Sequence, residues 1–196
     1  NIEISVSDGV SSASISPFSI EVTVIPSPPR EMPLTLHGGW NLSHFTKETT
    51  VTTIKQQVPE IDAIWSFLNC DKKWEYALFN SVSNTPIAGS NLTALEPGKG
   101  YWIKVTGIEK DQEVTVSLSD AVTNSITLQS VTYYSGWNSV GVTENVVISE
   151  TEIPEEISSI WGWEEYWVSH VDGVPIFLNS LQLLDQNKGY FIYSDQ

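Results

Sequence analysis

The sequence predicts an all-β protein made of two tandem copies of one small β module, with a β-hairpin in front of them. The segment Leu-Glu-Pro-Gly-Lys-Gly-Tyr-Trp-Ile at residues 95–103 returns as Leu-Asp-Gln-Asn-Lys-Gly-Tyr-Phe-Ile at residues 184–192. Each copy also opens with a Gly-Trp-Asn triplet and has an Ile-Trp pair midway. Several segments alternate apolar and polar residues, which is the period of a half-buried strand. We therefore expect mainly β structure, with one short helical turn per repeat.

Composition favours a folded and strongly acidic protein. Aromatic residues make up 11% of the 196 residues, whereas disordered segments are poor in them. With 24 acidic and 9 basic residues, the net charge of −15 would repel a phosphate backbone or an anionic membrane. No run of 18 apolar residues occurs. We expect neither a nucleic-acid partner nor membrane insertion, and, because the chain begins at Asn1 rather than Met, we expect it to be part of a longer protein.

The first 26 residues are predicted to be two strands of a separate β-sandwich. Residues 2–7 and 18–25 alternate apolar and polar side chains, and Asp8-Gly9 suits a turn. Three of the five residues 26–30 are prolines, which remove hydrogen-bond donors, so we place a linker at residues 27–32. The Val-Ser-Asp-Gly and Pro-Phe-Ser-Ile-Glu-Val segments within this region resemble the closing strands of dystroglycan-type cadherin-like domains of bacterial surface proteins.

The modules are predicted at residues 33–130 and 131–196. Each should open with a short strand, a glycine turn and a second strand, at residues 34–42 and 131–140. A proline before acidic residues then suits the first turn of a helix, at Pro59 and Pro154. Aromatic residues at alternate positions follow and predict an aromatic hairpin in each copy, from residues 64–67 with 74–76 and from residues 160–163 with Trp167.

Residues 113–118 and 125–128 alternate and are predicted to be two strands that finish the first copy. The second copy has no equivalent of them, so we expect residues 1–25 or 113–128 to fill that gap. The whole repeat resembles a Trp- and Gly-marked module found in tandem in bacterial secreted and cell-surface proteins. This resemblance covers residues 34–194 and implies an extracellular or cell-surface location, neighbouring domains of the same chain as partners, and no established activity.

Tryptophans can bind sugars when exposed or build a core when buried. We expect the tryptophans at matching places in both copies to be core residues: Trp40, Trp65, Trp137 and Trp161. Another group crowds three aromatic residues around an acidic turn, and strand alternation cannot bury all of them on one face. The candidate ligand-binding residues are therefore Trp163, Tyr166 and Trp167, beside Glu164 and Glu165.

Catalytic and metal chemistry have little support in the sequence. His37, His44 and His170 lie in no known catalytic motif, and neighbouring carboxylates such as Glu164 and Glu165 point apart. Calcium remains a candidate because acidic residues lie in predicted turns, but no dense ligand loop occurs; they are Asp8, Glu60, Asp62, Asp111, Asp120 and Asp172. The single cysteine, Cys70, cannot form an internal disulfide and is predicted to be buried or half-buried.

These observations favour a non-catalytic extracellular module that serves as a spacer, assembly or adhesion unit of a larger protein. A carbohydrate- or protein-binding module that uses exposed aromatic residues is the alternative, and a hydrolase fragment is a weaker one. We expect no enzyme activity, no cofactor and no catalytic or metal-binding residue.

Overall fold

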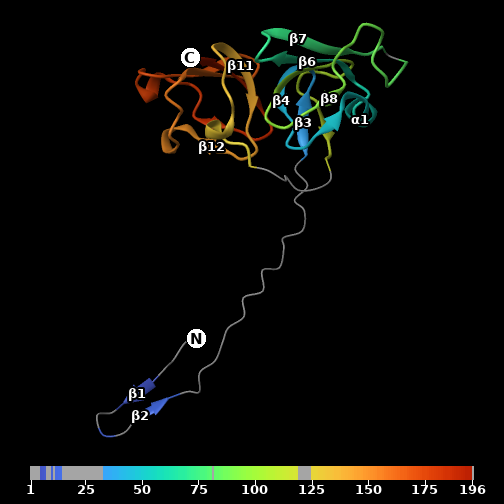
Figure 1. The fold of residues 1–196 in the computed structure, drawn as a ribbon. Helices are drawn as coiled ribbons and strands as arrows, with labels where there is room; N and C mark the ends of the chain where they lie inside the picture. The colour runs from blue at the N-terminus through green and yellow to red at the C-terminus, as the bar shows by residue number, and fades with distance from the viewer. Residues whose placement is uncertain are drawn as a thin grey trace. The chain divides into compact units, whose positions relative to one another are not determined.

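The computed structural model describes residues 5–7, 10, 12–14, 33–80, 82–118 and 125–195. The chain divides into two compact units, Asn1–Arg30 and Glu31–Gln196 (Figure 1). The first unit contains β1 (Ser5–Ser7) and β2 (Ser12–Ser14), which pair antiparallel. A hairpin therefore occurs where one was predicted, but its second strand lies in the serine-rich segment. The strand predicted at residues 18–25 lies outside the described residues.

The second unit contains two four-stranded antiparallel sheets. Their strand orders are β4-β9-β6-β7 and β11-β16-β13-β14, which are the same order in the two copies. This confirms the all-β fold class. The sheets consist of β4 (Gly39–His44), β6 (Ile61–Leu68), β7 (Lys73–Leu78) and β9 (Gly100–Val105), and of β11 (Gly136–Gly141), β13 (Ile157–Trp163), β14 (Trp167–Val171) and β16 (Gly189–Ser194).

The two sheets also share their register. Trp40 lies opposite Lys104, and Trp137 lies opposite Tyr193, which are matching positions of the repeat. A register shift follows the first residue of β6, between Ile61 and Ala63, and an equivalent shift occurs in β13 between Ile157 and Ser159. A repeated irregularity of this kind is typical of homologous strands, and it supports the reading of the chain as one module present twice.

Each module adds a small two-stranded sheet and a helical turn. The small sheets pair β5 (Thr49–Thr50) with β8 (Ala94–Leu95) and β12 (Val146–Val147) with β15 (Leu183–Leu184). The helical turns are α1 (Val51–Gln57) and η2 (Ile148–Glu150), and a further short turn is η3 (Ile176–Leu178).

The helical turns lie before the prolines, so the prediction that Pro59 begins a helix was wrong. Thr50 caps α1, because its hydroxyl accepts a hydrogen bond from the Thr53 N–H at 3.1 Å. The helix ends at Gln57, and Val58, next to Pro59, has left the helical region. Proline disfavours helical backbone in the residue before it, so Pro59 stops the helix.

The modules differ at one edge. In the first, β3 (Leu34–His37) pairs with β10 (Glu113–Val116), which finishes the copy as predicted. In the second, the described residues 131–134 have no partner strand and are not a strand, contrary to prediction. Residues 125–128 are not a strand either. Instead η1 (Leu128–Ser130) places a buried leucine in the second core, next to Tyr133, whose hydroxyl donates to the Leu128 carbonyl at 2.8 Å.

Each module has its own apolar core on one face of its sheet. In the first, α1 and the β3–β10 pair supply buried residues that pack with Ile64, Tyr101 and Ile103. In the second, Ile160, Tyr190 and Ile192 occupy the matching places.

The tryptophans predicted to form these cores lie on the opposite face of each sheet. Trp40 is 45% exposed and Trp137 42% exposed, while Trp65 and Trp161 are half-buried. That prediction was wrong because alternate residues such as Ile64 and Ile160 fill the core instead. Cys70, predicted to be buried or half-buried, is exposed.

Candidate functional site

The two modules join through reciprocal contacts between equivalent residues. The His44 N–H donates to the Asn187 carbonyl at 3.1 Å, and the Gly141 N–H donates to the Gly98 carbonyl at 3.1 Å. His44 is equivalent to Gly141, and Gly98 is equivalent to Asn187, so exchanging the modules reproduces the pair of bonds. This reciprocity defines a twofold, isologous interface, formed here inside one chain.

Glycine is required where the two modules approach most closely. A Cβ on Gly100 would lie 2.6 Å from the Ser139 hydroxyl, and a Cβ on its equivalent Gly189 would lie 2.8 Å from the Ser43 carbonyl oxygen. A Cβ on Gly141 would overlap the imidazole ring of His44. The glycine of each Lys-Gly-Tyr segment therefore permits the modules to pair.

His44 is buried in this interface as a neutral imidazole. Its Nδ1 lies 2.7 Å from the Gln186 carbonyl oxygen and donates to it, because its Nε2 must accept the Gly98 N–H at 3.0 Å. Burial lowers the pKa of His44 to about 4, and the backbone contacts with Gln186 and Val142 oppose this shift only in part. A proton on Nε2 would also face the Gly98 N–H instead of an acceptor.

The tyrosine of each Lys-Gly-Tyr segment closes the turn in front of it. The buried Tyr101 hydroxyl accepts the Glu96 N–H at 2.6 Å, and the buried Tyr190 hydroxyl accepts the Asp185 N–H at 2.6 Å. Burial raises the pKa of both tyrosines, which stay protonated. The repeated segment, from which the tandem repeat was recognised, thus has a structural role at the module interface.

The turns themselves differ. Gly98 has a φ of +84°, whereas the φ of Asn187 is not positive. Among the described non-glycine residues, only Lys72 and Glu165 have a positive φ. Asn187 therefore does not adopt the backbone conformation of Gly98. Its N–H instead donates to the Asp185 carboxylate at 2.7 Å, an Asx turn that replaces the Pro-Gly turn.

Two residues of each Gly-Trp-Asn triplet also have local roles. Gly39 and Gly136 adopt positive φ at the first residue of β4 and of β11. Asn41 accepts the His37 N–H at 2.9 Å and donates to the His37 carbonyl at 2.9 Å, and Asn138 makes the same pair of bonds with Tyr134. The tryptophan of the triplet has no such local role, and its ring lies on the outer, aromatic face of the sheet.

The aromatic faces of the two sheets meet each other. Trp102 lies 5.6 Å from Trp163 and 5.9 Å from Trp167, measured between ring centres, and Phe67 lies 6.3 Å from Phe191. The Trp163 indole N–H also donates to the Trp40 carbonyl at 3.2 Å. The rings of one module are thereby partly covered by the other.

Where this cover ends, the rings leave an open apolar pocket of about 390 Å³. In the part of the chain that the structure describes, all five side chains that line it are tryptophans. They come from four strands of the first module and one of the second: Trp40, Trp65, Trp74, Trp102 and Trp163.

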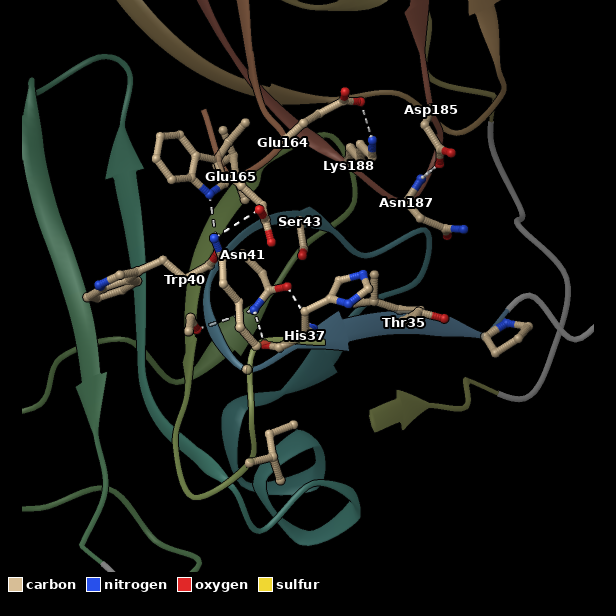
Figure 2. A pocket seen from close by; sticks show the side chains of 18 of the residues that line it. Thr35, His37, Trp40, Asn41, Ser43, Glu164, Glu165, Asp185, Asn187 and Lys188 are labelled. Atoms are coloured by element: carbon tan, nitrogen blue, oxygen red, sulfur yellow. Dashed lines mark hydrogen bonds and ion pairs between the residues drawn. The ribbon is translucent and has the colours of Figure 1, made fainter. Parts of the chain in front are cut away.

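A polar cleft of about 860 Å³ shares Trp40 and Trp163 with this pocket. Figure 2 shows side chains from β3 and β4 facing those of the second module across it. Lys110 pairs with Glu165 across the modules at 2.8 Å. Within the second module, Lys188 pairs with Glu164 at 2.6 Å.

The three residues predicted to bind a ligand are divided by the structure. Trp163 is half-buried and lines the pocket, whereas Tyr166 is 64% exposed and Trp167 is 47% exposed outside its lining. The sequence reasoning missed the other four lining tryptophans. Trp40 and Trp65 were predicted to be core residues. Trp65 and Trp74 lie in the predicted aromatic hairpin, and the structure confirms that hairpin.

Among the described residues, no group of three or more His, Cys, Asp or Glu side chains is placed to hold a metal ion. Asp8 and Asp120, two of the calcium candidates, lie outside the described residues. No helix in the described part of the chain has the length and apolar character needed to cross a membrane.

Comparisons of the chain with protein-family models, with curated proteins and with solved structures found no match.

Proposed function

We propose that this chain is a non-catalytic binding unit of a bacterial secreted or cell-surface protein, and that it holds its ligand against the five-tryptophan pocket. The observation that supports this proposal most directly is the open pocket lined by Trp40, Trp65, Trp74, Trp102 and Trp163. An apolar pocket beside a few polar groups is the usual form of a ligand site.

Leaving these rings in water is costly. A tryptophan buries 150 to 250 Å² when it is covered, at about 25 cal/mol per Å². A ring such as Trp40 or Trp74, exposed by 45% and 44%, therefore forgoes roughly 2 kcal/mol of burial. The exposed part of these rings adds nothing to the stability of the free chain, because it is also in water when the chain is unfolded. A ligand that covers them recovers this free energy.

The spacer and assembly role is the second candidate, and the interlocked interface supports it. The reciprocal bonds of His44 and Gly141 and the close contact of Gly100 with Gly189 tie the two modules together. A rigid pair of modules suits reach along a surface protein. This role and ligand binding are compatible, and the open tryptophan pocket favours binding.

The test is capture of ligands from a glycan array and from cell-surface extracts by the wild type and by Trp40→Ala and Trp74→Ala. Trp137→Ala is the matched control, because Trp137 is the equivalent of Trp40, is 42% exposed and lies outside the pocket lining. We expect the pocket variants to lose at least about 90% of the captured signal and the control to keep it. Equal capture by all four folded proteins would leave the spacer role alone.

A further inference from the structure

We infer that the five-tryptophan pocket binds an N-methylated ammonium group of the choline type. This inference rests on the proposed binding role and names the ligand class. A methylated ammonium ion is held by the π faces of aromatic rings and needs no hydrogen-bond partner. Tryptophan is the best of the aromatic residues for this purpose, and the described lining contains five of them and no other residue.

The scarcity of hydrogen-bonding groups decides against a hydroxylated ligand. The one polar group of a tryptophan side chain is its indole N–H, and that of Trp163 is already donated to the Trp40 carbonyl at 3.2 Å. A sugar that entered this pocket would find no side-chain acceptor for its hydroxyl protons, because an indole N–H only donates, and a hydroxyl left without a partner is costly. A methylated ammonium ion surrenders none, because it has no N–H.

The angles between the tryptophan rings also favour a compact cation over a flat sugar. Trp40 and Trp102 are perpendicular, with an interplanar angle of 90°, and Trp102 and Trp163 make an angle of 67°. Trp65 and Trp74 make an angle of 77°. The rings therefore present faces in different directions around the pocket. A flat polysaccharide surface needs coplanar rings, whereas a compact convex cation is surrounded by faces at large angles to one another.

Charge favours a cation. The net charge of −15 gives the protein an overall attraction for positive ligands. One tryptophan of the pocket already meets a positive charge, because Lys104 Nζ lies 5.8 Å from the centre of the Trp40 ring. Lys104 also pairs with Asp62 at 3.8 Å. Removing this lysine would leave more of the Trp40 ring, and the Asp62 charge, to a ligand cation.

The experiment titrates the whole chain with choline and, separately, with the neutral isostere in which carbon replaces the ammonium nitrogen. Tryptophan fluorescence and calorimetry report binding. We expect choline to bind at least about tenfold more tightly than the isostere, since cation–π attraction acts on the charged ligand alone. Trp40→Ala and Trp74→Ala should each weaken choline binding by about tenfold or more, and Trp137→Ala should leave it unchanged.

A second variant probes charge without altering the pocket rings. Lys104→Met should strengthen choline binding severalfold and leave the isostere unaffected. Equal affinity for the two ligands, or no choline binding by the folded wild type, would overturn the ammonium inference. If glycans are captured through Trp40 and Trp74 while choline is not bound, the inference fails and the binding role stands. If the pocket variants lose nothing in either assay, both fail.

Discussion

His44 and Gly141 occupy equivalent positions of the two modules, yet each is needed as it is. The imidazole of His44 fills the space that a side chain at position 141 would need. Two histidines would overlap there, and two glycines would leave the Gly98 N–H without its imidazole acceptor. The twofold interface is therefore asymmetric at this pair, which a chain with two differing copies can achieve and a homodimer cannot.

This pairing predicts a strong coupling between the two positions. Gly141→Ala alone should lower the free energy of unfolding by about 2 kcal/mol or more, because overpacking at a close contact forces the neighbours apart. In the His44→Gly background, which also removes the His44 Cβ that would lie 2.7 Å from the new Cβ, the same change should cost much less. Denaturant unfolding of the four proteins of this double-mutant cycle measures the difference. Equal costs in the two backgrounds would contradict the overlap of Gly141 with His44.

The buried imidazole also predicts a dependence of stability on pH. The folded pKa of His44 is about 4 and the unfolded value 6.5, so the unfolded chain binds the additional proton between these values. Stability should therefore be unaffected above pH 6.5 and should fall by about 1.4 kcal/mol per pH unit as the pH drops from about 6.5 toward 4.

Denaturant unfolding between pH 4 and 8 measures this effect, and His44→Gln isolates it, since the variant should be less stable at neutral pH but lack the added slope. His37→Gln is the control, because the side chain of His37 is 51% exposed. If the stability of His44→Gln still fell with the same slope below pH 6.5, groups other than His44 would be responsible for the pH dependence.

At the scale of elements, a single tyrosine holds each turn that precedes the central strands β9 and β16. Tyr101 and Tyr190 reach back over five residues to the N–H groups of Glu96 and Asp185, both at 2.6 Å. The turns have different sequences and backbones, yet the same closing bond. The tyrosine, rather than the Pro-Gly pair, is therefore the common structural requirement of the repeated segment.

We predict that Tyr101→Phe and Tyr190→Phe each lower the free energy of unfolding by about 1 to 3 kcal/mol, because the partner N–H is left without an acceptor. Thermal and urea unfolding measure both variants. Tyr166→Phe, at a 64% exposed position, is the control and should cost less than about 0.5 kcal/mol. A cost for only one of the two buried tyrosines would show that the two turns are not equivalent.

At the scale of the whole molecule, the modules share structure that neither could complete alone. Lys72 of the first module donates to the Trp137 carbonyl at 2.7 Å, and Trp163 of the second donates to the Trp40 carbonyl. Asn69 makes two bonds with the backbone of Ser139. Separating the modules would expose these groups together with the aromatic faces.

Residues 33–195 should accordingly unfold in one cooperative transition, although they contain two apolar cores. Tryptophan fluorescence and far-ultraviolet circular dichroism should give the same midpoint, and calorimetry should give equal van't Hoff and calorimetric enthalpies. Gly189→Ala brings a Cβ to 2.9 Å from the Gly100 Cα and should weaken the interface. We expect either two separate unfolding transitions or one transition whose midpoint is lowered equally in both probes. Two separate transitions in the wild type would mean that the interface contributes little.

The sequence by itself determined the repeat, the all-β class and the aromatic hairpins. Period-two alternation and repeated landmarks are local properties, and strands such as β6 and β13 follow from them directly. The boundaries of α1 were harder to predict from the sequence, because they depend on competition between a threonine cap and a proline. The structure of residues 131–134 was also harder to predict, because it depends on whether a partner strand is present.

Only the tertiary structure decided which face of each sheet is the core. In Tyr101-Trp102-Ile103 both faces are apolar, and alternation shows only that the tryptophan points away from its two neighbours. The layer that covers one face selects the inside: α1, β3 and β10 pack on Tyr101 and Ile103, so Trp102 is left on the outer face. There the second module covers part of the aromatic surface and leaves the tryptophan pocket open, because an interface between distant segments is formed by packing and not by local pattern.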